Sequence, residues 1–144
     1  MRYDELRDDS AQWQEIEEAQ RRSRGAGRWV AVSRVRRGDV WLVDFGEPIG
    51  RQQSGRRPAV VVSADALNDS RAGLVIVVPC TTAQRAALPR RTRSRRVRTR
   101  DEISYAKCED IKSISEERLV ARLGETPLDA MFAIARAVRF LLDL

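Results

Sequence analysis

The chain has 144 residues, 42% of them apolar, which is enough for one domain with a hydrophobic core and too few for two large ones. It contains no histidine and only two cysteines, which excludes Ser-His-Asp and Cys-His catalysis, a disulfide framework and a standard structural zinc site. No apolar run approaches the length of a membrane span, and the acidic start lacks the apolar core of a signal peptide, so we expect a cytoplasmic protein.

Residues 1–35 are expected to form an N-terminal extension. Ser10–Arg24 has the charge order of a helix, with acids early and arginines late, and a glycine-containing stop follows it. Its apolar positions are sparse, so such a helix would be marginal by itself. We predict an appendage, either docked through Trp13 or partly disordered, that precedes a domain spanning residues 36–144.

The middle of the chain predicts a small barrel of short strands separated by turn residues. The first three candidates are Asp39–Phe45, Pro58–Ser63 and Leu74–Val78, the last ending before Pro79. A long glycine-containing loop separates the first two, and a turn precedes the third. Shorter candidates follow at Ile103–Cys108, Ile111–Ile114 and Arg118–Leu123.

A basic segment interrupts these strands. Between Gln84 and Arg100 lie eight arginines and no acid, out of a net charge of +6 for the whole chain. Such density is typical of a surface that binds a polyanion. It is equally typical of a solvated loop in a chain that favours arginine, because Lys107 and Lys112 are the chain's two lysines among 27 basic residues.

The chain closes with a predicted helix. Thr126 as N-cap, Pro127 at the first position and Asp129 three residues after the cap form a start signal. We expect the main apolar stripe to pack on the core, and its extra width leaves room for a dimer contact. The main stripe comprises Leu128, Met131, Phe132, Ala135, Val138, Arg139 and Leu142, and it is widened by Ile134, Leu141 and Leu144.

Four stretches carry a family resemblance. They are Arg37–Phe45 (RGDVWLVDF), Gly50–Ser63 (GRQQSGRRPAVVVS), Val77–Thr82 (VVPCTT) and Ser104–Ile114 (SYAKCEDIKSI). In this order and spacing they resemble the MazF/PemK family of toxin endoribonucleases over about residues 36–144. The resemblance implies a mainly β (α+β) fold, an SH3-like barrel of five to seven strands with a C-terminal helix. It also implies a homodimer that cuts single-stranded RNA without a metal or other cofactor and is neutralised by a cognate antitoxin.

The resemblance also implies four catalytic positions. It places the family's key arginine at Arg57, its key threonine at Thr81, and a basic and an acidic residue at Lys107 and Glu109. The chemistry is reasonable in itself, because a ribose 2′-OH can attack its own phosphate when a base, an acid and donors to the phosphorane are present. Arg57 would stabilise charge rather than move a proton. On a strand, period-two spacing would put Lys107 and Glu109 on one face, as acid or charge clamp and as base.

Each of these residues also fits a purely structural role: a surface arginine before a strand, a polar strand end, an ordinary ion pair. Cys80 and Cys108 are interpreted as small core residues rather than catalytic thiols. Gln52 stands where family members commonly carry an acid, so a carboxylate role is lost there. The candidate RNA-binding residues are Arg51, Gln52, Gln53, Arg56, Thr82 and Ser104.

Three functions remain open at this point. The first is a metal-independent, sequence-selective RNA-cutting toxin. The second is a gyrase-poisoning toxin of the same fold, which relies on a C-terminal tail with Trp and Gly, whereas this chain ends Leu-Leu-Asp-Leu. The third is a non-catalytic nucleic-acid-binding protein or an inactive homologue, which the departure at Gln52 favours.

Overall fold

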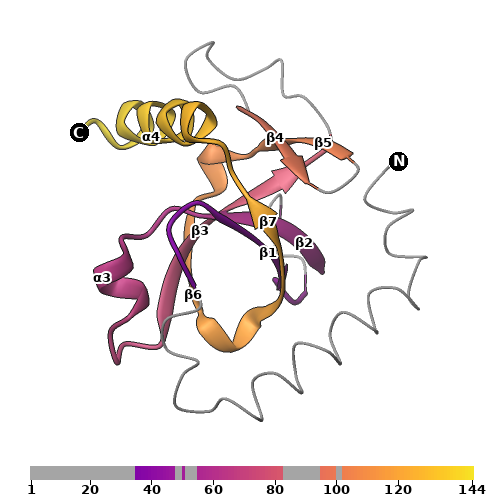
Figure 1. Cartoon of the computed structure of the whole chain (residues 1–144), viewed down its shortest axis with the longest axis vertical. Coiled ribbons are helices and arrows are strands. Elements are labelled where there is room, and N and C mark those ends of the chain that lie inside the picture. Colours follow the sequence, from indigo (N-terminus) through magenta and orange to yellow (C-terminus); the bar gives the residue numbers. More distant parts are fainter. Residues whose placement is uncertain (1–34, 48–49, 51–54, 83–94, 100–101) are drawn as a thin grey trace.

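The computed structural model describes residues 35–47, 50, 55–82, 95–99 and 102–144 (Figure 1). The predicted N-terminal helix and most of the arginine-rich segment lie outside these residues. The described part is mainly β, with an antiparallel sheet that curls round on itself and a long helix near the C-terminus.

Seven strands form within the described residues. Their order in the sheet is β4-β5-β3-β2-β1-β7, and β6 also pairs with β3. The sheet and the C-terminal helix confirm the predicted fold class. The strands are β1 (Asp39–Asp44), β2 (Arg56–Val61), β3 (Leu74–Thr81), β4 (Arg95–Thr99), β5 (Glu102–Ala106), β6 (Lys112–Ser115) and β7 (Leu119–Glu125).

Side-chain alternation along these strands separates two apolar clusters. One cluster contains Val60 and Cys80 and packs against helix α4 (Leu128–Leu142). The other contains Ala59 and Val77 and lies on the opposite face of the same strands. Because both faces of β1–β3 are covered, these strands are apolar along most of their length rather than strictly alternating.

Strand β3 continues through Pro79, where the sequence pattern predicted its end. Pro79 lies where the neighbour of β3 changes from β6, which pairs with Leu74–Val77, to β5, which pairs with Cys80 and Thr81. The Pro79 carbonyl accepts a hydrogen bond from the Lys107 backbone N–H at 2.7 Å. The proline's missing N–H therefore falls at a gap in the ladder, and the strand extends far enough to carry Thr81.

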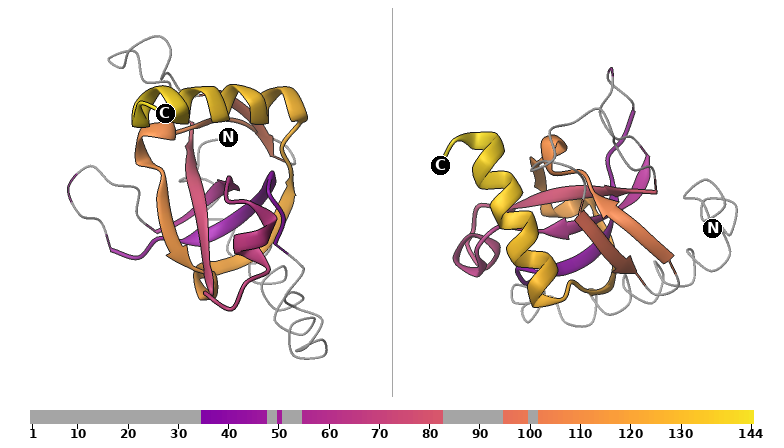
Figure 2. Two further views of the ribbon diagram at one scale, coloured as in Figure 1. Left: turned by 90° about the vertical axis from the view of Figure 1, so that its left-hand side faces the viewer. Right: turned by 90° about the horizontal axis from the view of Figure 1, so that it is seen from above.

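Helix α4 lies across one end of the curled sheet (Figure 2). It begins one residue later than predicted, because Pro127 rather than Thr126 is the N-cap and no side chain caps the helix. The Thr126 backbone N–H instead donates to the Gly38 carbonyl at 2.7 Å, which ties the start of the helix to the start of β1.

The prediction that the main apolar stripe of α4 packs on the core is wrong for Leu128 and Phe132. Leu128 and Phe132 are 72% and 64% exposed, whereas Met131, Ile134 and Ala137 are buried against the sheet. Apolar side chains surround so much of this helix that their spacing does not decide which side faces inward. Packing against β4 and the 3₁₀ turn η3 (Cys108–Asp110) decides it.

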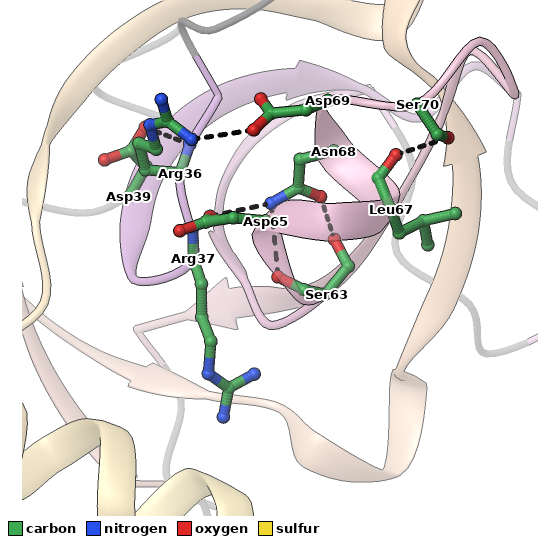
Figure 3. A network of polar contacts seen from close by, with 9 residues as sticks. All are labelled: Arg36, Arg37, Asp39, Ser63, Asp65, Leu67, Asn68, Asp69 and Ser70. Carbon is green, nitrogen blue, oxygen red and sulfur yellow. Dashed lines mark hydrogen bonds and ion pairs between the residues drawn. The ribbon is translucent and has the colours of Figure 1, made fainter.

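The start of the described chain is anchored to the short helix α3 (Asp65–Asn68). The Arg37 backbone N–H donates to Asp65 Oδ1 at 2.7 Å, and the Arg36 guanidinium pairs with Asp69 at 3.0 Å (Figure 3). Within the same network the Asn68 amide donates to the Ser63 carbonyl at 3.2 Å. These contacts, all made by described residues from Arg36 onward, hold the beginning of β1.

Deleting residues 1–24 should therefore leave the remaining chain folded. The anchoring contacts begin at Arg36, and the buried Val35 stays in place. We expect the melting temperature, followed by circular dichroism, to change by less than about 4 °C, which corresponds to less than about 1 kcal/mol for a chain of this size. A much larger fall would mean that the deleted segment packs into the core.

Candidate active site

The register of the central strands aligns two of the predicted catalytic positions. Ala59 of β2 pairs with Pro79 of β3, and extending this register by two residues sets Arg57 across from Thr81. Thr81 in turn pairs with Tyr105 of β5. Directly opposed residues of antiparallel strands lie on the same face, so Thr81 and Tyr105 share a face, and the continued register adds Arg57 to give a row across three strands.

This row begins where one apolar cluster ends. Arg57 pairs with Val43 of β1, and both Val43 and Ala59 are fully buried on the same face. Arg57 and Thr81 themselves are half-buried. A guanidinium beside an apolar floor attracts a phosphate more strongly than one surrounded by water, because the local dielectric constant is lower. The row therefore combines a positioned cation with a hydroxyl donor, which suits a phosphate.

Lys107 does not lie on a strand with Glu109, so the period-two prediction for this pair is wrong. Strand β5 ends at Ala106, and both residues belong to the η3 turn or its start. The Lys107 side chain is 4% exposed, and its ammonium lies 3.5 Å from Asp110 Oδ2. Its backbone bond to Pro79 nevertheless keeps Lys107 beside β3, two residues along from Thr81.

The Glu109 carboxylate oxygens are buried and have no hydrogen-bond partner among the residues that the structure describes. Burying an acidic group without hydrogen bonds lowers the stability of the folded chain, because the group loses its hydrogen bonds to water and gains none in exchange. Such unsatisfied groups concentrate at functional sites, where the missing contact is supplied by a ligand.

Asp110 and Lys112, which the sequence prediction did not include among the site residues, lie next to Lys107. Asp110 Oδ1 lies 3.8 Å from the Lys112 ammonium, so the Asp110 carboxylate sits between the chain's two lysines. The Lys112 ammonium also lies 5.0 Å from the centre of the Phe45 ring. The sequence does contain a signal for this cluster, because both lysines of an arginine-rich chain fall within three residues of one acid.

Ser104 is not available to RNA, contrary to the prediction. It is 1% exposed, and its hydroxyl donates to the Val97 carbonyl at 3.3 Å. It also hydrogen-bonds the buried Cys80 thiol, whose pKa burial raises to about 12. Cys80 and Cys108 both lie in the apolar cluster beneath α4, which confirms them as core residues.

The other predicted RNA contacts divide into two groups. Arg56 is exposed at the start of β2 and alternates to the face opposite the row, and Thr82 is half-buried just after β3. Arg51, Gln52 and Gln53 lie outside the described residues.

Fold and site together define a small β protein with a histidine-free, cation- and hydroxyl-bearing site on a curled sheet. Residues 36–142 match the family described as PemK-like, MazF-like toxin of type II toxin-antitoxin system. The chain is 31% identical over 115 residues to endoribonuclease MazF9 of Mycobacterium tuberculosis, covering 76% of this chain and 98% of that protein. It is 33% identical over 113 residues to endoribonuclease MazF2 of Mycobacterium bovis, with the same coverage. The chain belongs to this PemK/MazF-like toxin family.

Solved structures share the fold. MazF from Deinococcus radiodurans aligns with a TM-score of 0.61 at 24% identity, covering 76% of this chain and 97% of that one. An endoribonuclease from a mycobacterial species, solved in complex with its cognate antitoxin, aligns with a TM-score of 0.63 at 26% identity, covering 76% and 96%. Within the described residues, no helix has the length and apolarity required to span a membrane.

Proposed function

We propose that this chain is a toxin endoribonuclease that cuts single-stranded RNA by attack of a ribose 2′-OH on the adjacent phosphate, without a metal. Its relatives of 31% and 33% identity are named endoribonucleases. The observation that carries the proposal is the strand register, Val43 with Arg57 and Ala59 with Pro79, whose continuation by two residues would bring Arg57 across from Thr81. That arrangement offers a phosphate one fixed positive charge and one hydroxyl.

In this mechanism the P–O bond to the 2′ oxygen forms as the bond to the 5′ oxygen breaks, which leaves a 2′,3′-cyclic phosphate and a 5′-hydroxyl. Arg57 stabilises the negative charge on the phosphorane, and Thr81 donates to one of its oxygens. Glu109, whose oxygens accept no hydrogen bond from the described residues, accepts the 2′-OH proton. Lys107, whose side chain is 4% exposed and pairs with Asp110, adds positive charge to the site from beneath its surface.

Partners follow from the same proposal. One structural relative is bound to its cognate antitoxin, and we propose that an antitoxin likewise inhibits this chain. The exposed apolar side chains of α4, among them Leu128 and Phe132, are suited to contact a second copy in a homodimer. The cytoplasm is the proposed location, because the substrate is messenger RNA.

The direct test incubates the purified protein with a long unstructured RNA in EDTA. We expect cleavage of the RNA, with cyclic-phosphate ends, and none of a DNA of the same sequence, because DNA lacks the nucleophile. A 2′-O-methyl RNA should bind and stay intact. If folded, dimeric protein binds unmodified RNA without cutting it, the chain is instead a non-catalytic nucleic-acid-binding member of the family.

Replacing Thr81 by alanine should lower the single-turnover cleavage rate by about 10- to 100-fold, the worth of one hydrogen bond to a charged oxygen of about 1.5–3 kcal/mol. Thr81→Ser keeps the hydroxyl and should recover most of the rate. Equal rates for Thr81→Ala and the unchanged protein, with both folded, would remove Thr81 from the mechanism.

A further inference from the structure

The edge of the site contains an ion cluster whose composition is unusual for this chain. Of 27 basic residues, Lys107 and Lys112 alone are lysines, and both ammonium groups face the Asp110 carboxylate. A lysine ammonium is a compact charge with three donors on a flexible stem, whereas arginine presents a wide planar fork. Two lysines at one carboxylate, in a chain that otherwise uses arginine, indicate that this place requires the smaller cation.

The cluster is built to restrict motion. The Asp110 side chain is 13% exposed, and its backbone N–H donates to the Lys107 carbonyl at 2.9 Å, so the η3 turn fixes the position of the carboxylate. Lys112 is held from two sides, by Asp110 Oδ1 at 3.8 Å and by the Phe45 ring at 5.0 Å. A ring face attracts a cation, which favours one orientation of an otherwise mobile side chain.

Lys112 of this cluster lies on the face that carries the row of site residues. Lys112 pairs with Val77 of β3, which belongs to the same apolar cluster as Ala59 and Val43. Thr81 is four residues further along β3, roughly 13 Å away. The Lys112 side chain is 24% exposed, against 4% for Lys107, so Lys112 can meet a ligand from solvent.

We propose that Asp110 is a positioning residue that fixes both ammonium groups, and that Lys112, held in this way against Phe45, contacts an RNA phosphate next to the one bound at Arg57 and Thr81. This inference rests on the proposed function, because it assumes that RNA occupies the row. It assigns Asp110 no contact with the substrate and places Lys112 outside the bond-breaking step.

Net charge and positioning predict opposite results for Asp110→Asn. Removing an acid makes the site more positive, so charge alone predicts tighter RNA binding. Positioning predicts the reverse, because Lys112 loses the group that orders it. We expect Asp110→Asn to raise KM for a cleavable RNA by about 10-fold, with kcat changed less. Asp69→Asn is the matched control: it makes the same charge change at an exposed ion pair with Arg36 and should alter neither parameter.

The closing experiment measures binding of a 2′-O-methyl RNA, which cannot be cut, as a function of salt. Losing one phosphate contact on a single strand should lower the slope of log K against log salt by about 0.7. We expect this decrease for Lys112→Met and for Asp110→Asn, and no further decrease in the double variant. Asp110→Glu, which keeps the charge, should recover part of the affinity.

The inference is overturned if Asp110→Asn binds the 2′-O-methyl RNA as tightly as the unchanged protein, or more tightly, with an unchanged salt slope. Should Asp110→Asn fail to fold, Lys112→Arg decides instead: it keeps the charge but not the compact ammonium, and affinity equal to that of the unchanged protein would contradict the proposal. The proposed function fails separately, when the unchanged protein cuts no unmodified RNA while the binding differences among the variants remain.

Discussion

Replacing Arg57 by alanine should lower the single-turnover rate of RNA cleavage by about 10²–10³-fold, the usual cost of removing one preorganised donor to a developing oxyanion. The physical reason is the register, in which Arg57 pairs with the buried Val43 and, where the β2–β3 register is continued by two residues, lies across from Thr81. Because Arg57 lies at the start of β2 and is half-buried, the fold should survive the change.

Two controls make this result specific. Arg71→Ala removes an exposed arginine from the turn before β3 and should leave the rate unchanged. Arg57→Lys keeps the charge and loses the bidentate fork, so its rate should lie between those of the unchanged protein and Arg57→Ala. If folded Arg57→Ala cleaves at the normal rate, the phosphorane is stabilised elsewhere and the proposed site is wrong.

Replacing Glu109 by glutamine should change activity and stability in opposite directions. Loss of the general base should lower the cleavage rate by about 10²–10⁴-fold. The melting temperature should rise by roughly 4 °C, or about 1 kcal/mol, since a neutral amide is less costly than an acidic group to bury without a partner. Single-turnover kinetics and thermal unfolding of the same preparation measure both effects.

Glu116 provides the matched control for this prediction. It is an exposed acid on the neighbouring 3₁₀ turn η4 (Glu116–Arg118), and Glu116→Gln should change neither rate nor melting temperature. A fall in stability for Glu109→Gln would mean that the carboxylate makes a favourable contact in the folded chain. A normal rate would exclude Glu109 as the base.

The fold was predictable where sequence patterns are local. The β-branched runs of β2 and β3 and the Pro127 start signal place these elements to within a few residues. The sequence patterns fail where tertiary packing decides where an element ends or which of its faces is buried. A proline normally ends a strand. Pro79 instead lies within β3, because the strand that pairs with β3 changes from β6 to β5 at this point. The apolar residues of α4 allow more than one inward face, and only packing against β4 and η3 selects Met131 and Ile134.

The candidate site shows the same division. The resemblance indicated Arg57 and Thr81, but their alignment comes from the β2–β3 register, which depends on pairing between distant segments. Alternation suggested a shared strand face for Lys107 and Glu109, and it does not apply because the strand ends at Ala106. Apart from the two lysines nearby, nothing in the sequence pattern distinguishes Asp110 from the other acidic residues of the chain. Only the fold shows that two ammonium groups lie beside its carboxylate.

The scarcity of lysine has a practical consequence for chemical labelling. Reagents that acylate primary amines have three kinds of target in this chain: the α-amino group and the side chains of Lys107 and Lys112. Because Lys107 is almost inaccessible, a fluorophore coupled under limiting conditions would attach at Lys112 or at the N-terminus. Once the N-terminus is blocked, a single dye at Lys112 would report from beside the proposed site without any engineered cysteine.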